Sequence, residues 1–253
     1  MIDKEKLADL AKQLNTNQTT ITREYFQLLF LSILYEYKET QNIFFKGGTA
    51  IHLIFGGDRF SEDLDFTVEL SEAKFNKFIS SVFRRISGQY EIDFKKRRSI
   101  AGEKFLLTAR PPILPYPVFV SLDFSFREKI REPEKTIVKT NYPVLFTSYL
   151  YHPSKDEILA EKIRAVLTRE KGRDIYDLWF LLNQKAKINP KLIEEKLSYY
   201  RIKKFKKAEL LSKINRFKKE DFIKDLRPFV ALNNRDRLGS FFDYLCRYLQ
   251  KEL

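Results

Sequence analysis

The stretch Phe44-Phe45-Lys46-Gly47-Gly48-Thr49-Ala50, followed by Arg59-Phe60-Ser61-Glu62-Asp63-Leu64-Asp65-Phe66, decides the fold of this chain. It predicts a short apolar strand, a Gly-Gly turn, a helix opened by Thr49, and a second strand that carries two acids. Because strand residues i and i+2 point to the same face, Asp63 and Asp65 present their carboxylates on one side. The apolar residues around them indicate a strand that packs against a core.

The chemistry of this stretch suits a metal ion and a phosphate chain. Two neighbouring carboxylates repel each other unless a cation lies between them. Their oxygen atoms favour Mg²⁺ or Mn²⁺, which keep positions free for substrate phosphates. The turn at Gly47 and Gly48 and the helix N-terminus at Thr49 supply N–H groups for an anion such as a triphosphate. Alone, a Gly-Gly-Thr before a helix is usually only an N-cap, and an Asp-x-Asp is usually a solvated strand face or a turn. In this order, the two motifs together indicate nucleotidyl transfer.

The pattern Lys-Gly-Gly-Thr-Ala, with residues 59–66 after it, resembles the AbiEii/AbiGii toxin family. These are nucleotidyltransferase-fold toxins of bacterial and archaeal toxin–antitoxin and abortive-infection systems, and they include the MenT toxins. The wider DNA polymerase β-like superfamily has Gly-Ser or Gly-Gly, then Asp-x-Asp, then a third acid on a later strand. The resemblance covers roughly residues 40 to 185.

A third acid is predicted at Asp123, on the polar face of a strand over residues 118–126 whose other face is apolar. An aspartate in such a segment is out of place as a purely structural residue. The superfamily pattern implies that this acid lies beside the Asp-x-Asp pair, where it ligates a second metal or takes the proton of the attacking hydroxyl. Asp93 is a weaker rival, because the two lysines that follow it closely indicate an exposed strand.

A helical lysine and an Arg-Asp-x-x-Asp motif follow in the last hundred residues. Lys162 lies on a predicted helix, and the motif contains Asp174 and Asp177. The resemblance implies that Lys162 contacts the nucleotide phosphates and that one of the two acids orients this lysine or the substrate. The residues alone leave a structural alternative, with Asp174 as a helix N-cap and Asp177 favouring the helix dipole. For Ser61 two interpretations are likewise open: it contacts a phosphate, or it belongs to an ordinary turn.

Composition limits the class of protein. The chain has 253 residues, 43% hydrophobic and 32% charged, which is typical of a globular, soluble protein with one large or two small domains. The sequence contains no apolar run long enough for a bilayer and no signal-peptide core at its start, so we expect no membrane association and a cytoplasmic location. The single Cys246 excludes an internal disulfide framework and a cysteine zinc cluster, and the two histidines leave little material for a zinc enzyme.

The formal charge of +13 favours a polyanionic partner such as RNA, DNA or an acidic protein. Residues 185–227 contain fifteen Lys/Arg against six Asp/Glu, with aromatic residues between them. Such a segment could bind an RNA backbone, although helical spacing assigns most of the aromatic residues to a core. Lysine enrichment from genome composition or thermal adaptation is the alternative.

The sequence therefore predicts an α/β fold: a mixed-sheet nucleotidyltransferase core with flanking helices, and a helical C-terminal region. We expect residues 1–150 to form the core with its N-terminal helices, and residues 151–253 to form a helical domain that completes the site. Residues 111–117, with four prolines, are predicted to be a rigid extended connection. Further elements are predicted as helices over 3–14, 22–38 and 71–86 and as strands over 90–97 and 103–109.

The predicted function is metal-dependent transfer of a nucleoside monophosphate from an NTP to an acceptor, with release of pyrophosphate. The resemblance implies a toxin with a cognate antitoxin, and an RNA acceptor such as the tRNA 3′ end. The alternatives are a protein or small-molecule acceptor, or a non-catalytic nucleic-acid-binding protein on the same fold. The predicted catalytic residues are Asp63, Asp65, Asp123, Lys162 and Asp174; the metal ligands are Asp63, Asp65 and Asp123; the nucleotide contacts are Gly47, Gly48, Thr49, Ser61 and Lys162.

Overall fold

A computed structural model describes residues 1–99 and 102–253, and the chain divides into two compact units. The first, called here the sheet unit, comprises residues 1–56 and 60–153. The second, the helical unit, comprises residues 57–59 and 154–253. Residues 57–59 thus belong to the helical unit although the chain on both sides of them belongs to the sheet unit.

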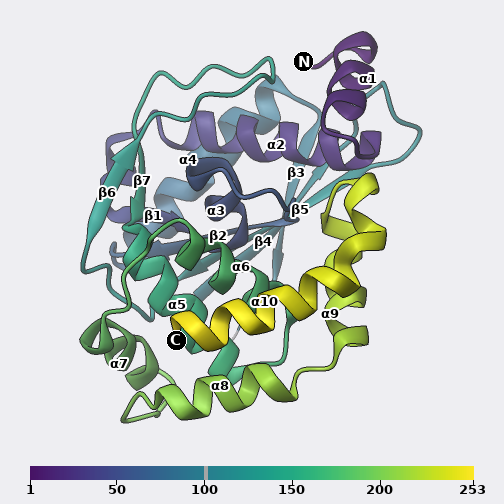
Figure 1. Ribbon diagram of the computed structural model, residues 1–253. Coiled ribbons are helices and arrows are strands. Elements are labelled where there is room, and N and C mark those ends of the chain that lie inside the picture. Colours follow the sequence, from purple (N-terminus) through teal and green to yellow (C-terminus); the bar gives the residue numbers. More distant parts are fainter. Residues whose placement is uncertain (100–101) are drawn as a thin grey trace. The chain divides into compact units, whose positions relative to one another are not determined.

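The sheet unit is built on a mixed sheet, as predicted. Within the described residues, five strands lie in the order β1-β2-β5-β4-β3 (Figure 1). The pairing of β2 with β5 is parallel and the other pairings are antiparallel. Two further short strands, β6 and β7, form an antiparallel pair. The strands are β1 (Ile43–Lys46), β2 (Asp63–Val68), β3 (Ile92–Arg97), β4 (Gly102–Ala109), β5 (Val118–Ser125), β6 (Pro133–Thr136) and β7 (Leu150–Pro153).

Helices α2 and α4 cover one face of this sheet with aromatic side chains. Phe66 of β2 and Phe124 of β5 stack with ring centroids 4.6 Å apart. Phe30 of α2 lies 6.4 Å from Phe66, and Phe75 of α4 lies 4.8 Å from Phe124. Each such buried ring contributes about 1.5–3 kcal/mol. Because strand side chains alternate, the opposite face carries the residues in between, which include Asp63, Asp65 and Asp123. The helices of this unit are α1 (Lys4–Gln13), α2 (Gln18–Leu34), α3 (Gly47–Phe55) and α4 (Glu72–Gln89), with a 3₁₀ turn at Lys38–Asn42.

Two local predictions for this unit are wrong. Helix α2 begins at Gln18 instead of residue 22, because the Asn17 side chain accepts a hydrogen bond from the Thr20 N–H at 2.8 Å and caps the helix there. Residues 111–117 do not form an extended connection. The Leu114 N–H donates to the Pro111 carbonyl at 3.1 Å, so the segment turns.

The helical unit contains six α-helices among the residues described from 154 onward. Ser154 caps the first of them by accepting a hydrogen bond from the Glu157 N–H at 3.1 Å. A fully buried lysine, Lys196, joins two helices through Glu157 and Glu161, at 2.5 and 3.4 Å. The helices are α5 (Lys155–Thr168), α6 (Gly172–Asn183), α7 (Pro190–Ser198), α8 (Lys207–Arg216), α9 (Lys219–Leu226) and α10 (Leu238–Glu252), with 3₁₀ turns at Arg227–Phe229 and Leu232–Arg237.

Across the described residues, no helix combines the length and the apolar character that crossing a bilayer requires.

Candidate active site

Two of the predicted acids lie side by side on the sheet face opposite α2 and α4. Asp65 of β2 and Asp123 of β5 are direct register partners on parallel strands, and Asp63 pairs with Ser121 in the neighbouring row. Partners in register point to the same face and lie about 5 Å apart between strands. The structure therefore places Asp63, Asp65 and Asp123 on one face, and Asp123 is partly open to solvent at 36% exposure.

The row that contains Asp65 and Asp123 extends across the whole sheet and is basic at both ends. Lys46 of β1 pairs with Asp65, Lys104 of β4 pairs with Asp123, and Arg97 of β3 pairs with Lys104. Lys104 Nζ lies 3.4 Å from Asp123 Oδ2. The two carboxylates are thus placed between cationic residues, as two neighbouring like charges require.

Asp93 does not belong beside these acids. It lies on the edge strand β3, which β4 separates from β5, and it pairs with Arg110. The structure thus brings Asp123, and not its rival, next to Asp65.

No preformed metal cage exists among the described residues, since no group of three or more Asp, Glu, His or Cys side chains is arranged to hold an ion. The chemistry of the donor set nevertheless fits a divalent cation. Asp63, Asp65 and Asp123 supply only oxygen ligands, from two adjacent strands and on one face. The Asp123 carboxylate, 3.4 Å from Lys104 Nζ, would have to exchange this partner for the ion.

Gly47 lies directly against the carboxylate of Asp65. Its φ is +79°, and a Cβ built on it would be 2.2 Å from Asp65 Oδ2. Helix α3 spans Gly47–Phe55, so it begins two residues before the predicted start at Thr49, although Gly47 itself keeps a left-handed φ. The first turn of the helix has N–H groups without intrahelical acceptors. Asp65 therefore lies at the N-terminus of α3.

We expect Gly47→Ala to lower nucleotidyl transfer by roughly 10- to 100-fold, because the new methyl group displaces the Asp65 carboxylate by about 1 Å or more. The positive φ adds about 1–2 kcal/mol of strain. Steady-state rates and urea unfolding measure the two effects. Gly88→Ala in α4 is the matched control, since its Cβ meets nothing within 4 Å. A Gly47→Ala protein with wild-type rates would contradict this account of Gly47.

Thr49 and Ser61 have structural contacts in the sheet unit. The Thr49 side chain is buried, and its hydroxyl donates to the Asp63 carbonyl, which ties α3 to the start of β2. A phosphate contact by Thr49 is left to its backbone N–H. The Ser61 carbonyl accepts a hydrogen bond from Gln27 Nε2 at 3.0 Å, so the loop before the acid strand is anchored on α2.

The helical unit contains a second charged group, called here the Lys162 centre: Arg59, Lys162, Arg169, Asp174 and Asp177. Lys162 Nζ lies 2.6 Å from Asp177 Oδ2 and 3.2 Å from Asp174 Oδ1. Arg59 binds Asp177 through two hydrogen bonds of 2.6 Å, and Arg169 binds Asp174 through two of 2.6 and 2.8 Å. Both acids therefore orient Lys162.

The N-cap alternative for Asp174 is wrong. Lys171 occupies the N-cap of α6, and Asp174 lies inside the helix with its carboxylate turned to Lys162 and Arg169. Asp177 is likewise fully buried, and it forms ion pairs with Arg59 and Lys162. The contact between Arg59 and Asp177 could not be found from the sequence, because 118 residues separate them.

The two acids of the Lys162 centre are held in their ionised forms. Burial favours a raised pKa for Asp174, but Lys162 and Arg169 lower the pKa well below the ordinary value. Burial also opposes ionisation of Asp177, and Arg59 and Lys162 hold its pKa below 3.8. Arg59, Lys162 and Arg169 thus hold the two carboxylates from three sides.

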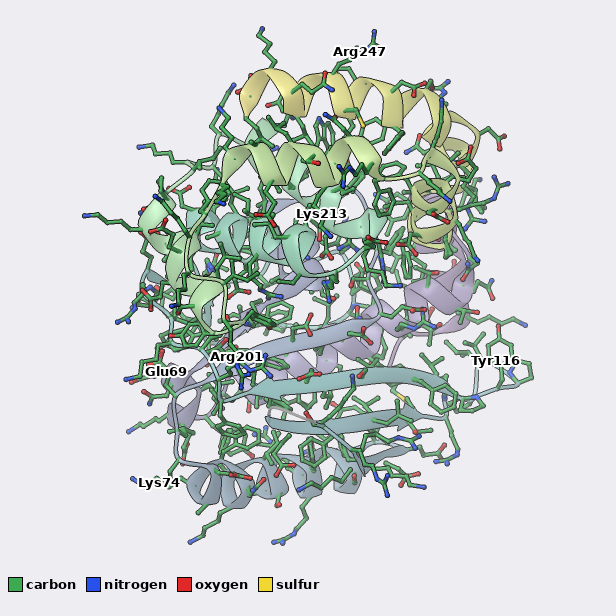
Figure 2. The ribbon with its side chains drawn as sticks, turned by 90° about the horizontal axis from the view of Figure 1, so that it is seen from below. Glu69, Lys74, Tyr116, Arg201, Lys213 and Arg247 are labelled. Atoms are coloured by element: carbon green, nitrogen blue, oxygen red, sulfur yellow. The ribbon has the colours of Figure 1, made fainter. Side chains whose placement is uncertain are left out.

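The basic segment 185–227 contributes to a cleft of about 700 Å³ in the helical unit. Lys213 on α8 is one of its residues (Figure 2). The expectation that most aromatic residues of the segment belong to a core is wrong. Phe222 is fully buried, whereas Tyr199, Tyr200, Phe205 and Phe217 are only partly buried, and the Tyr200 ring packs against the Arg164 guanidinium at 4.4 Å. The cations that line the cleft are Arg169, Lys171, Lys213, Arg216, Lys218 and Lys224, with Glu170, Glu209, Asp221 and Asp225 among them.

Comparison with known proteins identifies the family. The sequence profile of the nucleotidyl transferase AbiEii toxin of type IV toxin–antitoxin systems matches residues 29–242. This match is wider than the span of the motifs, and it reaches from α2 into α10. No curated protein sequence matches the chain.

Solved structures share the fold at low sequence identity. MenT4, a nucleotidyltransferase toxin from Mycobacterium tuberculosis, is 18% identical with a TM-score of 0.68, over 96% of this chain and 89% of that chain. JHP933 from Helicobacter pylori is 19% identical with a TM-score of 0.55, over 93% of this chain and 95% of that chain. Together with the acid row, the profile match shows that the chain is a nucleotidyltransferase and belongs to the AbiEii toxin family of type IV toxin–antitoxin systems.

Proposed function

We propose that this toxin transfers a nucleoside monophosphate from an NTP to the 3′-terminal hydroxyl of an RNA, tRNA in particular, using Mg²⁺ or Mn²⁺. The observation that carries the proposal is the register of β2 and β5, which makes Asp65 and Asp123 neighbours on one sheet face with Asp63 in the next row. A catalytic role explains why three acids are gathered there.

Asp63, Asp65 and Asp123 are the proposed metal ligands. A divalent ion bound by them supplies positive charge for the developing charge on the transferred phosphoryl group. In the reaction, the acceptor hydroxyl oxygen forms a bond to the α-phosphorus, and the bond from that phosphorus to the bridging β-phosphate oxygen breaks. Pyrophosphate leaves, and Asp123 accepts the hydroxyl proton.

The nucleotide is assigned to two sets of residues. The N–H groups of Gly47, Gly48 and Thr49 at the start of α3 bind phosphate oxygens, because a helix N-terminus favours an anion. Ser61, anchored beside the acid strand, helps to position the same chain of phosphates. Lys162 supplies a cation for the nucleotide phosphates, and Asp174 and Asp177 orient it. The contacts of Lys162 Nζ with both acids, at 3.2 and 2.6 Å, support their orienting role.

An RNA acceptor accords with the charge of the chain. The net charge of +13 attracts a polyanion, and the cleft with Lys213 adds a concentration of cations. We further propose that the protein acts in the cytoplasm, where tRNA is present, and that a cognate antitoxin limits its activity.

The test incubates the purified protein with each α-³²P-labelled NTP, Mg²⁺ and total cellular RNA. We expect label in tRNA-sized RNA, no label with EDTA, and no label after periodate oxidation of the RNA 3′ ends. Label that survives nuclease and migrates with protein would favour a protein acceptor instead. RNA binding without any transfer, over all four NTPs and both metals, would overturn the proposal in favour of a non-catalytic protein.

A further inference from the structure

The sheet face with the acids continues into exposed cations on strands β4 and β3. Arg97 and Lys104 lie in the row of Asp65 and Asp123. Lys95 lies at the end of the neighbouring row, which runs from Asp63. Since adjacent strands are about 4.8 Å apart, these backbones lie about 5 to 10 Å from that of β5. Both rows that contain an acid of β2 therefore end on β3 with a cation on the same face.

The two faces of the edge strand β3 differ in how their cations are used. Lys96 points to the face opposite the acids, where Glu103 binds it at 2.7 Å. Lys95 and Arg97 point to the acid face and are exposed, and within residues 1–99 and 102–253 no carboxylate forms an ion pair with either. On the acid face, β3 thus carries two exposed cations that form no ion pair within the described residues.

An exposed aromatic side chain lies on the same face. Phe119 of β5 lies four residues before Asp123, so the two side chains point to the same side. Its exposed fraction is 46%, whereas Phe124, on the other face of the strand, is fully buried. Its row runs through Thr108 to Asp93 and is the second row from that of Asp123. Exposed aromatic rings on a face that also carries cations are typical of single-stranded nucleic-acid sites, where bases stack on the rings.

Lys104 links the cations to the acids. Its ammonium lies 3.4 Å from Asp123 and gives this carboxylate a positive neighbour. Both side chains are more than one-third exposed, so the pair is easily exchanged for other partners. When a divalent ion takes Asp123, the flexible lysine side chain can turn to a phosphate on the same face.

We propose that Lys95, Arg97, Lys104 and Phe119 form an acceptor strip, which binds the phosphate backbone and one base of the RNA strand whose 3′ hydroxyl reacts beside Asp123. The inference rests on the proposed function and adds to it where the acceptor binds. Charged residues on an edge strand also prevent sheet-to-sheet aggregation. That role explains charges on β3, but it does not explain Lys104 on the interior strand β4 or the exposed Phe119 on β5.

The experiment reverses the charge of the two strip residues on the edge strand β3, in the double variant Lys95→Glu/Arg97→Glu. Lys104, which contacts Asp123, stays unchanged. The matched control is Lys74→Glu/Lys77→Glu on α4, which covers the opposite face of the sheet; Lys74 is seen there in Figure 2. Binding of 5′-fluorescein tRNA is measured by anisotropy over a range of salt concentrations. KM for tRNA and for the NTP is measured by transfer of label.

We expect the strip variant to raise Kd and KM for tRNA at least about tenfold. The negative slope of the logarithm of the tRNA binding constant against log salt should become less steep by about 1.4. Each of the two replaced cations neutralises one phosphate and accounts for about 0.7 of the slope. KM for the NTP and the control variant should stay as in the wild type. Phe119→Ala should raise Kd on the order of tenfold because the ring no longer stacks on a base, without a change of salt slope.

The outcomes separate this inference from the proposed function. Unchanged tRNA binding and salt slope in the strip variant would overturn the strip, even if the wild-type protein labels tRNA. A rise in KM for the NTP alone would also overturn it, because the cations would then bind the triphosphate. Weakened RNA binding in a protein whose wild type labels no RNA would show that these residues bind RNA, but it would overturn the transferase proposal and with it the strip's role of holding a reacting strand.

Discussion

Asp65→Asn should lower kcat for nucleotidyl transfer on the order of 1,000-fold and leave the fold unchanged. Asp65 is the central acid, since it is the register partner of Asp123, follows Asp63 by two residues and lies against Gly47 at the start of α3. The amide has the same shape but lacks the charge with which Asp65 is proposed to hold a divalent ion. A loss of about 4 kcal/mol of transition-state stabilisation corresponds to this change in rate.

The control for this prediction is Asp93→Asn. Asp93 is an exposed acid of the same sheet, but it lies on the edge strand and pairs with Arg110. We expect this variant to keep wild-type transfer. Label incorporation measures activity, and circular dichroism with thermal unfolding checks the fold of both proteins. If Asp65→Asn kept more than a tenth of wild-type activity, the assignment of Asp65 to the metal would be wrong.

The acid face shows what the sequence could predict of the site. The alternation of polar and apolar residues is a local property, so it identified Asp63, Asp65 and Asp123 and the faces of their strands. The order of strands is not local. The parallel pairing of β2 with β5, separated by α4, β3 and β4 in the chain, is what makes Asp65 and Asp123 neighbours. The place of Lys104 next to Asp123 likewise follows from the order of the strands, which puts β4 beside β5.

The Lys162 centre illustrates the same limit in another way. Its helical lysine and the Arg-Asp-x-x-Asp motif were recognisable because they lie within one short span. The choice between an N-cap and an ion pair for Asp174 depended on where α6 begins, and helix ends are set by competing caps within one or two residues. Arg59, from the linker before the acid strand, could not be paired with Asp177 without the tertiary structure.

Asp177→Asn should destabilise the helical unit by about 3–5 kcal/mol. Asp177 is fully buried and accepts hydrogen bonds from Arg59 and Lys162, and the amide leaves both cations without their charged partner in a buried place. The single tryptophan of the chain reports on this unit, because Trp179 lies on α6 against Tyr176 and Phe241. Urea unfolding followed by tryptophan fluorescence therefore measures the effect.

The comparison with Asp236→Asn and the pH dependence make this prediction specific. Asp236 is 90% exposed and lies 3.8 Å from Arg227, so its loss should change stability by less than about 1 kcal/mol.

Arg59 and Lys162 lower the pKa of Asp177 against the opposing effect of burial. The stability from its ion pairs is therefore complete above the pKa of the unfolded carboxyl, about 3.9, and is lost as pH falls through the lower folded value. The difference between wild type and Asp177→Asn should thus be constant above about pH 5 and narrow below about pH 4. A difference that instead narrowed between pH 7 and 5 would mean that Asp177 is not the ionised partner of Arg59 and Lys162.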